Sequence, residues 1–195
     1  MRGLTIVLVG LALLAGCARS PAPTLHALLP QAHEPPATTR DDGRLRIVIA
    51  TTIVPQSIDR PQLLVQDARG GLTLADGERW AEPLKRAIPR ALAYYLSADL
   101  DGAIVWSAGS AAPARADARI LLEVTRWESV LGRHAASDVL WTVRTANGEH
   151  SGRTTTDVPV QGSDYAALVA AHRDALRRVS RDIAAGIQGA LAPAQ

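Results

Sequence analysis

RILLEVTRWESV (residues 119–130) is the stretch of sequence that decides the fold, together with the residues that follow it. Apolar and polar residues alternate along it, which is the period of a β-strand. The same alternation returns at Val139–Thr145, and Arg153–Val160 follows the turn-forming pair Asn147-Gly148. Three consecutive strands joined by short turns predict an antiparallel meander.

A long amphipathic helix is predicted after the meander. Apolar residues recur there with a period of 3.6 almost to the end of the chain, and Ser163 or Asp164 can cap the first amides. The opposite side of this helix is basic and carries Arg173, Arg177, Arg178 and Arg181. We interpret that side as a solvated surface, the alternative being a patch for lipid headgroups.

A second helix is predicted before the meander, opening at Asp76-Gly77-Glu78 and ending by Asp101-Gly102. Asp76 can cap its amides, and Glu78 suits the positive end of the helix dipole. Residues at helical spacing form its apolar face: Trp80, Leu84, Ala87, Ile88, Ala91 and Tyr95. Pro89 lies beyond the first turn, so it predicts a bend or a division of the helix near Lys85.

The remaining elements are short strands. They are Leu45–Ala50, a hairpin of Gln62–Gln66 with Leu72–Ala75 around a Gly-Gly turn, Ala103–Ser107, and a short strand within Leu25–Leu29. The sum is an α+β fold: a single domain with a mostly antiparallel sheet and two main helices packed on one face of it.

The N-terminus predicts an exported lipoprotein. Arg2 precedes a short apolar run that is too short to span a bilayer, and the run ends in Leu14-Ala15-Gly16-Cys17. Small residues followed by cysteine match the bacterial lipobox, in which the thiol receives a diacylglycerol. Cys17 is the sole cysteine of the chain, which favours this interpretation over an ordinary secretory signal with an incidental cysteine.

The predicted organisation follows from that cleavage site. Residues 1–16 are the signal peptide, residues 17–43 a lipidated cysteine with a proline-rich tether, and residues 44–195 the α+β domain. More than one acyl chain on Cys17 would hold the protein durably in a membrane, and the tether would let the domain stand off the surface. By resemblance to sorted lipoproteins, the absence of Asp at Ala18 implies the outer membrane, on its periplasmic face.

The sequence carries no sign of catalysis, a metal or a nucleic-acid partner. No nucleophile elbow, phosphate-binding loop or metal-ligand spacing of histidines is present. A net charge of +2 is too close to neutral for a nucleic-acid footprint. We therefore expect a protein that is not an enzyme and has no cofactor except the covalent lipid on Cys17.

Two sequence blocks carry a resemblance to a known family. The first runs from Pro55 to Val65 and contains Ile58-Asp59-Arg60-Pro61-Gln62, and the second is Arg79-Trp80-Ala81-Glu82-Pro83-Leu84. Together with the lipobox they resemble the ABC-type transport auxiliary lipoproteins, the PqiC-like group. Ile58 stands where that family usually has leucine, and Gly70-Gly71 lies in a hairpin where the family often has a polar residue.

The resemblance implies an accessory role in intermembrane lipid transport. Such lipoproteins work with MCE-domain periplasmic proteins and their inner-membrane permease systems, which are thought to move phospholipids and keep the envelope intact. Phospholipid is a further candidate ligand, and a homo-oligomeric ring would suit the end of a tunnel. The alternative is a structural or assembly lipoprotein of the outer membrane with no transport role. An envelope hydrolase is a third hypothesis, disfavoured because no nucleophile–base pair is present.

The two blocks supply the candidate partner-binding residues. These are Asp59, Arg60, Pro61, Gln62, Arg79, Trp80 and Glu82. We expect the second block to lie on the first turn of the helix, close enough to contact the first. The alternative is that the charged residues of both blocks form one internal network with Trp80 buried beneath it.

Overall fold

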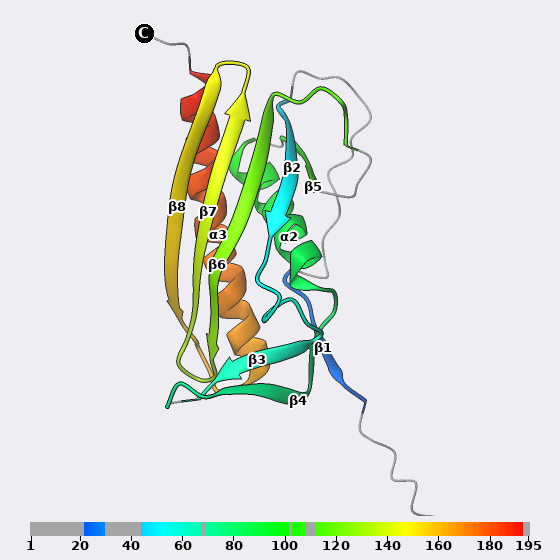
Figure 1. The fold of residues 1–195 in the computed structure, drawn as a ribbon, viewed down its shortest axis with the longest axis vertical. Coiled ribbons are helices and arrows are strands. Elements are labelled where there is room, and N and C mark those ends of the chain that lie inside the picture. Colours follow the sequence, from blue (N-terminus) through cyan, green and yellow to red (C-terminus); the bar gives the residue numbers. More distant parts are fainter. Residues whose placement is uncertain (1–21, 30–43, 68, 102, 108–111, 193–195) are drawn as a thin grey trace, which may run out of the picture.

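The computed structural model describes residues 22–29, 44–67, 69–101, 103–107 and 112–192. Within them lie two helices and eight strands, which form two sheets. Five strands, in the order β5-β2-β6-β7-β8, form a long sheet with α2 and α3 on one face (Figure 1). A smaller sheet of β1, β4 and β3 lies across one end of the molecule. The α+β class, the single domain and its two main helices are confirmed.

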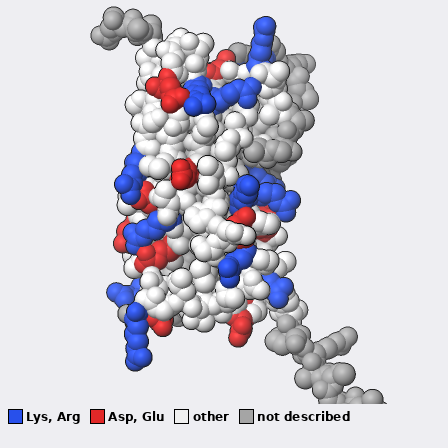
Figure 2. Space-filling view, in the orientation of Figure 1, with Lys and Arg blue, Asp and Glu red and all other residues white. Residues whose placement is uncertain are grey.

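The predicted meander is confirmed. β6 (Ala118–Val130), β7 (His134–Thr145) and β8 (Gly148–Pro159) are antiparallel along their whole lengths. Gly148 has φ of 140° in the Asn147-Gly148 turn, a region that glycine enters without steric cost. Figure 2 views the side of this sheet that faces away from the helices, and charged side chains of both signs are interspersed over it.

The remaining strands make both sheets mixed. β2 (Arg46–Ile53) is parallel to both neighbours, β6 and β5 (Ile104–Ser107). In the small sheet, β3 (Gln62–Gln66) is antiparallel to β4 (Leu72–Trp80), while β1 (Thr24–His26) is parallel to β4. The antiparallel pairing predicted from the sequence therefore holds for the meander and the hairpin. The strands outside them are parallel, because longer connections return the chain in the same direction.

The predicted start of the first helix is wrong. Asp76-Gly77-Glu78 belongs to β4, which continues through Arg79 and Trp80, and α2 spans Leu84–Asp99. The apolar spacing from Leu84 onward is helical as expected. Trp80, predicted on the same helix face, is buried but belongs to a strand. β4 lies between β1 and β3, so its backbone N–H and C=O groups form hydrogen bonds with both neighbours. These replace the hydrogen bonds that the same groups would form within a helix.

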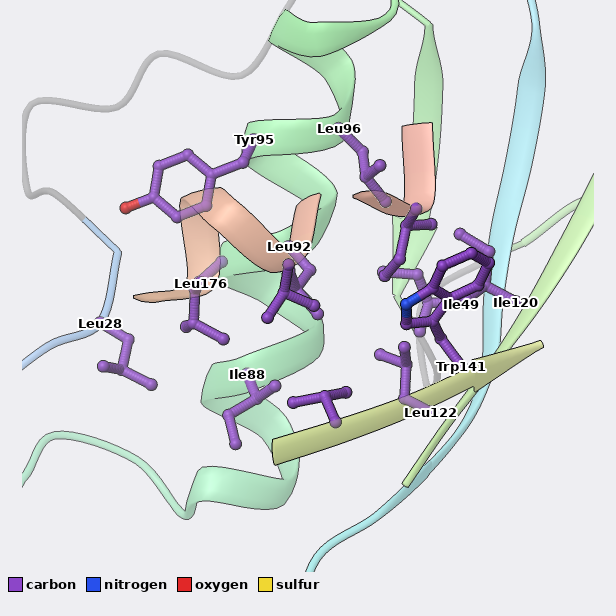
Figure 3. Close-up of a cluster of buried hydrophobic side chains, with 14 of the residues drawn as sticks. Leu28, Ile49, Ile88, Leu92, Tyr95, Leu96, Ile120, Leu122, Trp141 and Leu176 are labelled. Carbon is purple, nitrogen blue, oxygen red and sulfur yellow. The ribbon is translucent and has the colours of Figure 1, made fainter. Parts of the chain in front are cut away.

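Of the bend or division predicted from Pro89, the division is wrong, because α2 is continuous through this residue. Proline removes one helical hydrogen bond and crowds the preceding turn. Pro89 lies among the buried residues of α2, so packing against the core offsets that cost. Figure 3 shows the core into which Ile88, Leu92 and Leu96 of this helix point.

α3 (Tyr165–Leu191) begins where the sequence predicts, and its opposite end borders the meander turn. The Asp164 carboxylate accepts a hydrogen bond of 2.7 Å from the Ala167 amide, the capping contact expected for this position. Trp141 of β7 lies between Gly152 of β8 and Gly186 of α3, and an added Cβ at either glycine would come within 3 Å of its ring. The two glycines make room for one tryptophan between helix and sheet.

The short strand predicted within Leu25–Leu29 is present as β1. Leu28, which follows it, is 1% exposed and belongs to the main core (Figure 3). Arg173 of α3 donates to the Ala27 carbonyl at 2.6 Å, so this segment is held by both the sheet and a helix. Among the described residues, no helix is long and apolar enough to cross a membrane.

Candidate functional site

The two family-like blocks meet where the small sheet joins the rest of the domain. We call this region the junction and define it as Asp59–Gln62 with Arg79–Glu82. The Trp80 amide donates to the Pro61 carbonyl at 2.7 Å, and Gln62 is the ladder partner of Arg79. The Ala81 amide donates to the His26 carbonyl at 2.8 Å, which adds β1 to the same region. Backbone pairing therefore brings the blocks together.

Asp59 caps the helix that follows the second block. Its Oδ1 accepts a hydrogen bond of 3.0 Å from the Lys85 amide, one of the first amides of α2. Pro83 occupies the N-cap position and has no side chain able to do this. The cap thus comes from a residue outside the helix, and it is not Asp76 as the sequence suggested.

Replacing Asp59 with alanine is expected to lower the free energy of unfolding by about 1 kcal/mol, since the helix loses its cap. The measurement is urea denaturation followed by circular dichroism. Asp76→Ala is the matched control, because Asp76 is exposed on β4 and caps no helix. Equal effects of the two substitutions would contradict the capping role.

The charged side chains of the junction do not form the single network that the sequence suggested as an alternative. Asp59 contacts the backbone of α2, whereas Glu82 forms an ion pair of 3.0 Å with Arg90 in the second turn of the same helix. Arg60 has a buried Nε without a hydrogen-bond partner in the described part of the chain. Arg79 is exposed. The charges therefore fix local segments separately.

Trp80 is buried beneath the junction, as that alternative proposed, in a cluster with Trp127 of β6 and His172 of α3. The Trp127 and His172 rings are stacked, with centroids 4.2 Å apart and 4° between their planes. Trp80 meets both edge-on, at 6.5 Å from Trp127 and 6.2 Å from His172. This aromatic cluster joins the small sheet, the long sheet and α3.

His172 is fully buried. Burial lowers its pKa to about 3, so the ring is neutral at physiological pH. Its Nε2 lies 2.8 Å from the Ser129 hydroxyl, and its Nδ1 has no partner among the described residues. No signal in the sequence pairs His172 with Trp127, since they lie on elements far apart in the chain.

The described residues contain no group of three or more side chains able to hold a metal ion. Surface hollows of about 300–350 Å³ are open and are lined by residues such as Ala50–Val54 with Lys85, or Thr154–Thr156 with Arg178, Arg181 and Asp182. Cys17, the predicted lipidation site, lies outside the described residues.

Comparison with known proteins gives a family. The model of the ABC-type transport auxiliary lipoprotein component family matches residues 26–184. A crystal structure of an uncharacterized protein is similar at 17% identity and a TM-score of 0.67, covering 85% of this chain and 98% of that one. Protein XCC0632 from Xanthomonas campestris is similar at 22% identity and a TM-score of 0.56, covering 85% and 92%. No curated protein sequence matches significantly.

Proposed function

Because this chain belongs to the family of ABC-type transport auxiliary lipoprotein components, we propose that it serves an MCE-type system that moves phospholipids between the two membranes. In this role it is anchored to the outer membrane, docks to the periplasmic MCE protein and supports envelope integrity. The observation that carries the proposal is the family match over residues 26–184, behind a lipobox that ends at Cys17. The family is a transport component and not a family of enzymes.

The anchor in this proposal is the lipid on Cys17. The absence of Asp at the next position, Ala18, supports sorting to the outer membrane. Separation of inner and outer membranes on a density gradient tests the location. Recovery in the outer-membrane fraction supports the proposal, and recovery in the inner-membrane fraction contradicts it.

The contacts at the junction divide the seven candidate residues by role. Asp59, Trp80 and Glu82 are engaged within the domain, as a helix cap, a buried ring and an ion pair. The remaining four, Arg60, Pro61, Gln62 and Arg79, are the candidates for direct contact with the partner, and Pro61 and Arg79 are exposed. The first three then act by holding the other four in place.

Affinity purification of the tagged lipoprotein from gently solubilised envelopes tests the function, with proteins identified by mass spectrometry. We expect an MCE-domain protein in stoichiometric amount. Recovery of peptidoglycan-associated or assembly proteins alone would favour the alternative, a structural lipoprotein with no transport role.

Arg79→Glu is expected to reduce the co-purified MCE protein about tenfold, which corresponds to about 1.4 kcal/mol of binding free energy. The side chain is exposed, so charge reversal changes the surface and leaves the core intact. Arg115→Glu, at another exposed arginine, is the control and should retain the partner. Equal recovery with both variants would remove Arg79 from the contact surface.

A further inference from the structure

The small sheet has one face turned towards the domain and one turned away from it. On the inner face, Leu63, Ala75 and Trp80 are buried. Ladder partners lie on the same face of a sheet, as do alternate residues of one strand. Leu25 pairs with Arg79, Arg79 pairs with Gln62, and Leu64 pairs with Leu74. Gln62 and Leu64 are alternate residues of β3, so these residues and Leu72 share one face across a register shift between the two pairs. We call this the outer face, although Leu64 itself is half-buried and packs against the main core.

Three exposed leucines lie on this outer face. Leu25 is 61% exposed, Leu72 66% and Leu74 39%. They are three of the five large apolar side chains that are exposed in the described part of the chain. Leu72 and Leu74 lie near one end of β4, and Leu25 pairs near its other end. Exposed apolar side chains that share one face can mark a contact surface.

The position of β1 connects this face to the lipid anchor. Thr24, the first residue of β1, is only seven positions after Cys17. A fully extended chain of that length spans at most about 24 Å. The strand itself is held in place, since His26 Nε2 lies 2.5 Å from the Glu78 carboxylate and the His26 carbonyl accepts from the Ala81 amide.

The rest of the domain extends away from this end. α3 has 27 residues, which makes it about 40 Å long, and it runs along the long axis from the small sheet to the far end (Figure 1). A lipid on Cys17 therefore keeps the small sheet close to the bilayer. The tether available for standing off the membrane is the short segment before Thr24, and not all of residues 17–43.

We propose that the outer face of the small sheet rests on the bilayer that the Cys17 lipid enters, with Leu25, Leu72 and Leu74 at the boundary between headgroups and acyl chains. This inference rests on the lipid anchor of the proposed function. Exposed Arg69, in the turn between β3 and β4, is placed to meet lipid phosphates. Arg79 and Gln62 of the junction lie on the same face, so the MCE protein would meet this lipoprotein at the membrane surface.

The test uses the lipidated mature protein in vesicles of phosphatidylethanolamine and phosphatidylglycerol. Cys17 is the single cysteine and is blocked by its lipid, so an introduced cysteine takes a fluorophore at one site. Leu74→Cys reports on the outer face. Leu140→Cys, on the open face of the long sheet, is the matched control, since Leu140 is 38% exposed and Leu74 39%.

We expect a blue shift of the fluorophore emission at position 74 and loss of its intensity when nitroxide-labelled lipids are added, with neither change at position 140. Three results would overturn the proposal. They are water-like emission at position 74, equal quenching at both positions, or a blue shift at position 74 that disappears on dilution without quenching, which indicates a second copy of the chain. The vesicles contain no partner protein, so failure of the MCE proposal leaves this result unaffected.

Discussion

Replacing Trp80 with alanine is expected to lower the free energy of unfolding by about 3–5 kcal/mol, the range for removing a buried tryptophan side chain. Trp80 is 6% exposed and contacts the rings of Trp127 and His172, so the substitution leaves a cavity where three elements meet. Urea denaturation at neutral pH measures the change. The loss should be accompanied by easier proteolysis of the small sheet, because Trp80 joins that sheet to the His172 ring of α3.

Trp106→Ala is the control for this prediction. Trp106 lies on β5 and is only half-buried, so its removal leaves a smaller cavity and should cost clearly less. A Trp80→Ala variant as stable as Trp106→Ala would show that the aromatic cluster does not hold the two sheets together.

Acid is expected to destabilise the protein through His172. Its folded pKa of about 3 lies below the ordinary value of 6.5, so the unfolded chain binds the proton more tightly. The free energy that the unprotonated His172 ring contributes to folding is therefore fully present above pH 6.5. It is lost as the pH falls from 6.5 towards 3. Linkage predicts a loss of about 2 kcal/mol between pH 7 and pH 5.

The effect of His172 can be distinguished from that of the carboxylates because the two act in different pH ranges. The pKa values of Glu128 and Asp138 are lowered by hydrogen bonds from Arg126 and Arg153, so their contributions are lost only below their ordinary values of 4.5 and 3.8. Urea denaturation of the wild type and of His172→Gln, at pH 7 and pH 5, measures the effect. The glutamine variant cannot titrate and should lose about 2 kcal/mol less over this interval. Parallel losses in both proteins would contradict burial of a neutral His172.

The contacts of the junction could be predicted only in part from the sequence. The sequence indicates that the two blocks lie close together and that Trp80 is buried, but it places the second block on a helix, whereas Arg79 and Trp80 belong to β4. It does not indicate which charged groups meet. Asp59 caps a helix that begins 25 positions later, and that contact exists only once the loop before β3 folds back over α2.

The short strand β1 is a second case. Its apolar residues are visible in the sequence, yet their effect depends on β4, more than fifty positions away. Pairing with β4 makes Thr24–His26 part of the small sheet, so the described domain begins a few positions after Cys17 in the sequence. A proline-rich stretch alone suggests a long tether.

The sequence by itself determined the meander with its Asn147-Gly148 turn and the helix capped by Asp164, because periodicity, turn chemistry and capping act between near neighbours in the chain. Tertiary structure decided that Asp76–Trp80 is a strand, that β2 is parallel to its neighbours, and that His172 is neutral in the core. Each of these depends on partners distant in sequence, whose hydrogen bonds and burial outweigh local preference.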